Sequence, residues 1–208
     1  MEEKRMTERE SLAVITEMIS RTKERYIGDG NIMLMWGYLT VAVSVLVWML
    51  IATTGNLLWN WCWLLIPLIG GIATPIMSRK RDVKSGVKSY SDRVTSQIWF
   101  VVIISAVVSM LFNFGFGILA HIPTGAVMLV FALMIVPFAE VAQGIIVKEK
   151  SLVIGGAIGL CIGIFTVCCI VGDVAIRANW FIPLFIVAFI CMMIVPGHII
   201  NYKSKQLQ

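Results

Sequence analysis

Few side chains in this sequence could do chemistry, and several of them fall inside long apolar segments. Glu140 and Gln143 lie in one such segment, Asn113 lies in another, and His198 lies near the end of the last one. An ionisable group at membrane depth is costly and is therefore a functional candidate. Because burial disfavours the charged form of a carboxyl group, Glu140 could take up and release a proton. Alternatively, Glu140 is a hydrogen-bonded structural group, or its side chain extends toward the membrane surface. His198 is expected at the membrane surface.

Other reactive groups are scarce. Asp173 and Arg177 are expected to form an ion pair between the last two apolar segments. The chain has no His-Glu-x-x-His, Gly-x-Ser-x-Gly or phosphate-binding Gly-rich Lys motif, which argues against an enzyme. We expect no catalytic residue, cofactor or metal site, and no Cys-x-x-Cys spacing occurs. The five cysteines are interpreted as small packing residues: Cys62, Cys161, Cys168, Cys169 and Cys191.

The composition predicts which elements position these side chains. Of 208 residues, 59% are hydrophobic and 14% are charged, and the mean hydropathy is +0.89. A soluble domain has about 25% charged residues. These values exclude an ordinary soluble enzyme, a disordered chain and a free nucleic-acid-binding domain, and they predict an all-α integral membrane protein. Because a span needs about 20 apolar residues, the uncharged runs predict six spans, at about 31–53, 57–77, 97–119, 125–147, 152–174 and 179–201.

The distribution of basic residues predicts the orientation. Sixteen of the seventeen Lys and Arg residues lie on one side of the six spans, and only Arg177 lies on the other. Since basic loops stay in the cytoplasm, we expect three hairpins with both termini in the cytoplasm, in a bacterial inner membrane. The net charge of +5 is then a topology signal, and nucleic acid is not an expected partner. The expected parts are a cytoplasmic helix and hinge (1–29), a membrane domain (30–202) and a cytoplasmic tail (203–208).

Two segments outside the spans could bind partners. Residues 7–27 predict an amphipathic helix that lies on the membrane or the bundle, or that docks a cytoplasmic protein or a second copy. The segment Gly28-Asp29-Gly30 predicts a flexible joint after it. The basic segment 78–94 is interpreted as an anchor for anionic lipid headgroups, with a docking loop as the alternative. The helix has a capping box at Thr7 and Glu10 and an apolar stripe at Leu12, Ile15, Ile19 and Tyr26.

Small residues at four-residue spacing predict close helix packing, within one chain or between chains. One line is Ser151, Gly155, Gly159 and Gly163, and the other is Ser105, Ser109, Asn113 and Gly117. A second pattern is Met-Ile-Val-Pro, which occurs at 134–137 and again at 193–196, while Leu65-Ile66-Pro67 resembles it. The pattern raises the hypothesis of a threefold internal repeat.

Four stretches together carry a resemblance to a known family: ESLAVITEMISRTKERY, MWGYLTVAVSVLVW, VKSYSDRV and MMIVPGHIINYKSK. With them, the chain resembles a family of six-span bacterial inner-membrane proteins of similar length, for which no activity is established. The resemblance covers the whole chain and implies the same topology. It brings no functional residues with it. The genes of the family often lie beside a small winged-helix regulator, which implies a regulated membrane response.

Two function hypotheses remain open. The first is a non-enzymatic regulatory, sensory or scaffold role, exerted through the N-terminal helix and the basic segment. The second is a small transporter or channel with a proton-linked Glu140. The second hypothesis predicts that Glu140, Asn113 and His198 meet in one solvated cavity.

Overall fold

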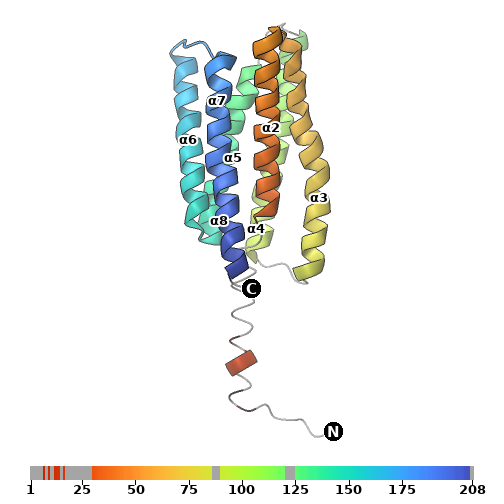
Figure 1. Ribbon diagram of the computed structural model, residues 1–208, viewed down its shortest axis with the longest axis vertical. Coiled ribbons are helices and arrows are strands. Elements are labelled where there is room, and N and C mark those ends of the chain that lie inside the picture. The colour runs from red at the N-terminus through yellow and green to blue at the C-terminus, as the bar shows by residue number, and fades with distance from the viewer. Residues whose placement is uncertain are drawn as a thin grey trace.

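The computed structural model describes residues 7, 9, 12–14, 16, 30–85, 90–119 and 125–206, without the side chains of 57 and 81–90. Every regular element in this part of the chain is a helix, and the helices lie side by side in one bundle (Figure 1). They are α2 (Asn31–Thr54), η1 (Leu57–Leu64), α3 (Leu65–Ser85), α4 (Tyr90–Leu119), α5 (Gly125–Val147), α6 (Lys150–Val171), α7 (Ala178–Phe189), η2 (Ile190–Ile194) and α8 (Val195–Gln206).

Six helical segments are long and apolar enough to cross a membrane, which confirms the predicted number. They are Asn31–Thr54, Leu58–Lys80, Ser91–Leu119, Gly125–Val147, Lys150–Val171 and Ala178–Gln206. The last segment combines α7, η2 and α8 into one continuous span. The chain therefore has the length and composition of an all-helical, multi-pass membrane protein.

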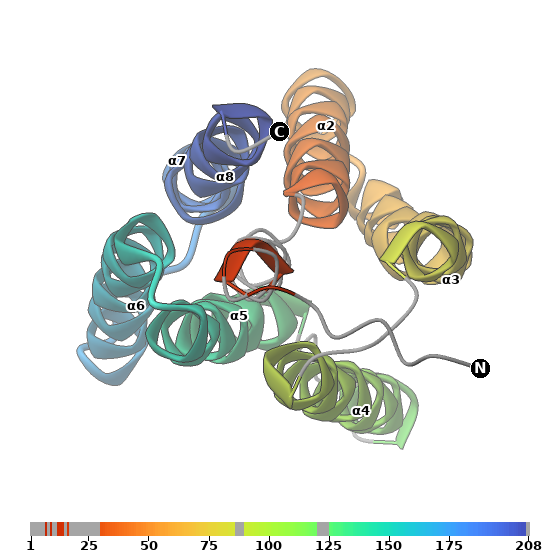
Figure 2. The same cartoon turned by 90° about the horizontal axis from the view of Figure 1, so that it is seen from below.

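The helices follow one another in a curved row that almost closes on itself, with α3 and α4 at its two ends (Figure 2). Along the row, α3 packs on α2, α2 packs on α7 and η2, η2 packs on α6, and α6 packs on α5 over the most extensive contact in the bundle. Helix α4 then packs on α5 at the far end. Only 6% of the α3 and α4 spans is buried, against 28% to 39% of the other four, so α3 and α4 are the peripheral helices.

The centre of the bundle is the span that contains α7 and η2. Phe181, Phe185 and Phe189 lie one turn apart on α7, and all three are buried. The Phe185 and Phe189 rings are 4.6 Å apart, and Trp63 of η1 packs edge-on against Phe185 at 5.7 Å. Trp63 is thus a core side chain, whereas Trp61 is 56% exposed.

Local sequence explains where the helices change. Gly55 ends α2 in the left-handed conformation (φ 64°), and the Asn56 side chain then accepts a hydrogen bond from the Leu58 N–H to begin η1. Pro67 lies in the first turn of α3, where its missing N–H costs nothing. In the last span, Val195 donates to the Ile190 carbonyl five residues earlier, so η2 is a single π turn next to Pro196.

The basic segment 78–94, for which the sequence left a docking loop as the alternative to a lipid anchor, is mostly helical. Helix α3 continues to Ser85 and α4 begins at Tyr90, so only residues 86–89 lie outside the described helices. Charged residues end an apolar run, but Lys and Arg are good helix formers. Hydropathy therefore marks where a span ends, and it does not mark where the helix ends.

The predicted N-terminal helix lies mostly outside the described residues. Arg9, Leu12–Val14 and Thr16 are helical, and the Thr16 hydroxyl donates to the Leu12 carbonyl at 2.8 Å. Leu12 is 63% exposed. The other helix positions, with Gly28 and Asp29, are not described: Glu10, Ile15, Ile19 and Tyr26 are among them.

The predicted flexible joint is wrong at Gly30. Gly30 is buried, its N–H donates to the Asn201 side chain of α8 at 2.7 Å, and a Cβ there would overlap the Gly197 carbonyl oxygen. The glycine serves a close approach of α2 to α8. The bundle therefore begins at a fixed contact.

Candidate functional site

Glu140 occupies the most unusual environment in the described part of the chain. Its side chain is fully buried, and neither carboxylate oxygen has a hydrogen-bond partner there. Buried polar groups are nearly always paired, and an unpaired buried charge costs several kcal/mol. Thr95 Oγ1 is the other buried polar atom without a partner among the described residues. Packing alone therefore does not explain why a glutamate occupies position 140.

Gln143 lies one turn after Glu140 but faces a different helix. Its side-chain oxygen accepts a hydrogen bond from the Trp99 indole of α4 at 2.7 Å. A Trp N–H normally needs such a partner when it is buried. Gln143 thus holds α4 against α5 and makes no bond to Glu140.

The predicted glycine line on α6 packs within one chain. A Cβ on Gly159 would lie 2.8 Å from the Pro137 Cβ of α5 and 2.9 Å from the Met192 sulfur of η2. Gly155 and Gly163 are equally crowded. Helix α6 therefore lies between α5 and the last span, at distances that only glycine allows.

Both Met-Ile-Val-Pro motifs pack on this glycine line. Pro137 has no N–H to donate to the Leu133 carbonyl four residues earlier, and that oxygen faces Gly163, where a Cβ would overlap it. In the π register of η2, Pro196 stands opposite the Cys191 carbonyl, which would lie 2.7 Å from a Cβ on Gly155. Each proline therefore directs a carbonyl without its helical donor at a glycine of α6, a geometry that permits Cα–H···O contacts.

The third copy of the proposed repeat does not share this arrangement. Pro67 lies in the first turn of α3, and the nearby Gly70 faces the Trp36 ring of α2. Two of the three motifs thus share this packing and Leu65-Ile66-Pro67 does not, while the threefold repeat itself stays a hypothesis.

The π turn is held from its other side by α2. A Cβ on Gly37 would lie 2.9 Å from Ile194 Cγ1 and 3.0 Å from Met193 Cβ. Single π turns are frequent at functional sites. Here the π turn packs between Gly37 of α2 and Gly155 of α6, and neither position has room for a side chain.

Helix α8 joins three elements at the end of the bundle that carries the basic residues. His198 Nε2 is 2.7 Å from the Tyr38 hydroxyl of α2, so His198 is paired there. Asn201 accepts from the Gly30 N–H and donates to the Asn31 side chain at 2.8 Å. We call Tyr38, His198, Gly30, Asn31, Asn201, Lys203 and Glu149 the α8 cluster.

The Lys203–Glu149 ion pair completes the α8 cluster. Lys203 Nζ is 2.7 Å and 2.9 Å from the two Glu149 oxygens, and the Ser151 hydroxyl donates to the same carboxylate at 2.9 Å. Burial alone would raise the pKa of Glu149, which is 5% exposed. The hydrogen bonds from Lys203 and Ser151 outweigh it and lower the pKa below its ordinary 4.5. The pair fixes the α5–α6 turn to α8.

Two predicted roles are corrected. Ser151 is not a member of the close-packed line, because it lies in the first turn of α6 and donates its N–H and hydroxyl to Glu149, the N-capping residue of that helix. Asp173 and Arg177 make no ion pair with each other in the described structure. A pair four residues apart needs a helix between its members, but α6 ends before Asp173, which is left-handed (φ 57°).

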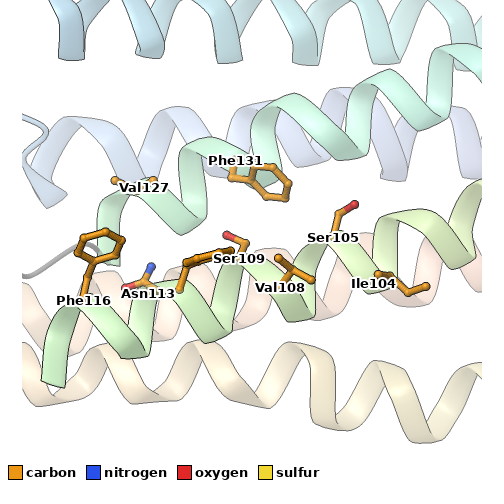
Figure 3. A pocket seen from close by; sticks show the side chains of 9 residues that line it. Ile104, Ser105, Val108, Ser109, Asn113, Phe116, Val127 and Phe131 are labelled. Atoms are coloured by element: carbon orange, nitrogen blue, oxygen red, sulfur yellow. The ribbon is translucent and has the colours of Figure 1, made fainter. Parts of the chain in front are cut away.

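Asn113 lines a groove between α4 and α5, together with Ser105 and Ser109 (Figure 3). The groove has a volume of about 490 Å³. A Cβ on Gly117 would have nothing within 4 Å, so the line on α4 does not pack closely within the chain, and packing between chains stays a prediction. The groove does not include Glu140 or His198, and these three side chains have separate surroundings.

Sequence reasoning missed most of the α8 cluster. Asn201, Tyr38 and Glu149 were not singled out, because each looks like an ordinary residue at a span end. One signal was present: Asn31 and Asn201 flank the first and last apolar runs on the same predicted side. No group of three His, Cys, Asp or Glu side chains in the described part of the chain could hold a metal ion.

Comparison with known proteins gives no match: no protein-family model fits the chain, and no curated protein or solved structure is significantly similar to it. The fold and the site geometry therefore define the class of protein on their own, a helical multi-pass membrane protein in whose described part Glu140 is buried without a hydrogen-bond partner.

Proposed function

We propose that this chain is a non-enzymatic protein of the bacterial inner membrane, threaded as three hairpins with both termini in the cytoplasm. Its role is regulatory, sensory or scaffolding, and it acts through its cytoplasmic end. The charge distribution supports this orientation, since sixteen of seventeen basic residues gather on one side.

The observation that carries this proposal is the contact between Gly30 and α8. Gly30 is the first residue of the bundle after the N-terminal segment, and Asn201 holds its N–H. Asn201 lies two residues from Lys203, which binds Glu149 at the α5–α6 turn. A change in the packing of α6 or α8 therefore reaches the residue from which the N-terminal segment departs.

The N-terminal segment offers apolar surface for a partner. Leu12 is 63% exposed and Val14 is 37% exposed on its described helical part. Exposed apolar side chains of an amphipathic helix bind either a membrane or a groove in another protein. A cytoplasmic partner is the proposed ligand, with lipid as the alternative.

The test is co-purification from native membranes, measured by quantitative mass spectrometry. Leu12→Asp should abolish retention of a cytoplasmic partner and leave the amount of inserted protein unchanged. Ala13→Asp is the matched control, because it adds the same charge at an exposed position beside the stripe. Equal retention by both variants would refute a docking role for this helix.

A proton-linked transporter is the second candidate, because Glu140 is fully buried without a partner. The helices packed on α5 bring few charges to it. Helix α6 has Lys150 at its first residue, α7 and η2 have none, and α4 has Asp92 and Arg93 near its start. The remaining titratable side chains on these elements are Tyr90, Cys161, Cys168, Cys169 and Cys191.

Two substitutions separate this candidate from a structural role. Glu140→Gln removes the titratable proton at nearly constant size, and it should abolish any pH-dependent flux in liposomes. Glu140→Leu removes an unpaired polar group, so it should leave thermal stability unchanged or raise it by about 1 kcal/mol. If Glu140→Gln changes neither flux nor partner retention, Glu140 has no proton-linked role.

A further inference from the structure

The groove between α4 and α5 is a cavity that the proposed function leaves unused. Toward one end, the Trp99–Gln143 hydrogen bond holds the two helices together. Toward the other end, the groove is lined by Asn113 and Phe116 of α4 and by Val127 of α5. This end of α4 and α5 lies at the opposite end of the bundle from α8 (Figure 1).

The lining of the groove is apolar on most sides and polar along one line. Ser105 and Ser109 face α5 from α4, and Phe131 faces them from α5 (Figure 3). Neither serine hydroxyl makes a hydrogen bond within the described part of the chain, whereas Ser44, Thr74 and Thr166 each bond a carbonyl four residues earlier. A hydroxyl can donate and accept. The full lining is Ile104, Ser105, Val108, Ser109, Phe112, Asn113, Phe116, Val127 and Phe131.

The lining chemistry selects a class of ligand. No charged side chain lines the groove, so a charged ligand group would be buried without a partner, at a cost of several kcal/mol that binding would have to overcome. The volume of about 490 Å³ lies in the range of small-molecule sites. The lining residues of α4 run from Ile104 to Phe116, which is about 18 Å of helix. The site is thus long and neutral.

We propose that this groove binds a neutral, single-chain amphiphile that reaches it from the bilayer. The chain of the ligand lies along Val108, Phe112 and Phe131, and its hydroxyl or carbonyl group bonds Ser105 or Ser109. The bound ligand fills the space between α4 and α5. This inference does not depend on the proposed regulatory function.

The experiment uses the full chain in phospholipid nanodiscs and a photoactivatable diazirine analogue of hexadecanol as the probe. Peptides that contain Ile104–Phe116 and Val127–Phe131 should be labelled, and labelling should saturate although phospholipid is in excess. Unlabelled hexadecanol should compete roughly tenfold better than hexadecane, because one or two hydrogen bonds distinguish them. Hexadecanoate should compete poorly, because its charge finds no partner.

Matched variants make the result specific. Ser109→Phe fills the groove and should abolish labelling, whereas Val107→Phe adds the same ring at a 52% exposed position outside the groove and should not. The double variant Ser105→Ala with Ser109→Ala should keep labelling and lose the preference for hexadecanol over hexadecane.

Three outcomes would overturn the proposal. Equal labelling of Ser109→Phe and Val107→Phe would mean that the probe binds elsewhere. Equal competition by hexadecane would mean that the groove holds ordinary lipid chains. A disulfide-linked dimer formed by Ser109→Cys would mean that a second copy of the chain fills the groove.

Discussion

Helices α6 and α4 carry similar lines of small residues, yet they pack in opposite ways. On α6, Gly155, Gly159 and Gly163 are buried against α5 and the last span, where no side chain would fit. On α4, Ser105 and Ser109 face an open groove, and Gly117 has no neighbour within 4 Å. Four-residue spacing therefore allows a close contact without guaranteeing one.

The difference lies in the partner helices. Helix α6 faces two prolines, and each leaves a carbonyl without its helical N–H donor next to a glycine: Leu133 beside Gly163, and Cys191 beside Gly155. Helix α4 faces α5 through Phe131 and Val127, which offer no such carbonyl and are too bulky for backbone contact. A glycine line becomes a packing site when a proline-altered helix lies opposite.

The largest expected effect is a leucine in the α6 line. Gly159→Leu would force a side chain against Pro137 and Met192, so thermal unfolding in detergent should show a loss of about 3 kcal/mol or more. Gly117→Leu is the matched control on α4, and it should not destabilise the protein, because the added side chain has open space and Leu is a better helix former than Gly. Similar losses in both variants would remove the distinction between the two lines.

Glycine-to-alanine substitutions should change stability in opposite directions on α6 and on α4. Gly163→Ala would place a methyl group against the Leu133 carbonyl oxygen and should destabilise the protein by about 1–3 kcal/mol. Gly115→Ala has open space around it and should stabilise α4 by up to about 1 kcal/mol, because Ala is the better helix former. Thermal denaturation of both variants in the same detergent measures the sign directly.

The smallest effect concerns the ion pair at the start of α6. The pKa of Glu149 is lowered from 4.5 in the folded protein, so its stabilising contribution is present above that pH and is lost as the pH falls through the lowered pKa. Because Lys203 is 45% exposed, the contribution should be about 1 kcal/mol or less. Lys203→Met should therefore lower stability at pH 7 and flatten its decline toward pH 3. If the decline in stability toward pH 3 is unchanged in Lys203→Met, groups other than Glu149 cause it.

Much of the fold could be predicted from the sequence, because hydropathy and length dominate membrane helices. The six spans agree with the structure within a few residues at most ends. At 78–94 the sequence did not predict that the helices extend beyond the spans, since charge ends a span while helix propensity continues the helix. The prediction failed at Gly30, because glycine serves both flexible joints and close contacts, and only the position of Gly197 distinguishes them.

The candidate site was predictable only in part. Glu140 stood out because a carboxyl group in an apolar run is rare. Its lack of partners depends on what α6, α7 and α4 bring near it, and no local pattern contains that. The Asp173–Arg177 pair failed because a left-handed residue at the end of α6 breaks the helical spacing that the pairing requires.

The most direct test of the account is whether Asn201 links the bundle to the N-terminal segment. Amide hydrogen exchange of residues around Gly30, measured by mass spectrometry in nanodiscs, compares Asn201→Ala with Tyr202→Phe, a change at an exposed neighbour. We expect exchange to rise roughly tenfold in Asn201→Ala, since two hydrogen bonds are lost, together with weaker partner retention. Tyr202→Phe should change neither. Unchanged exchange and unchanged partner retention in Asn201→Ala would contradict the account.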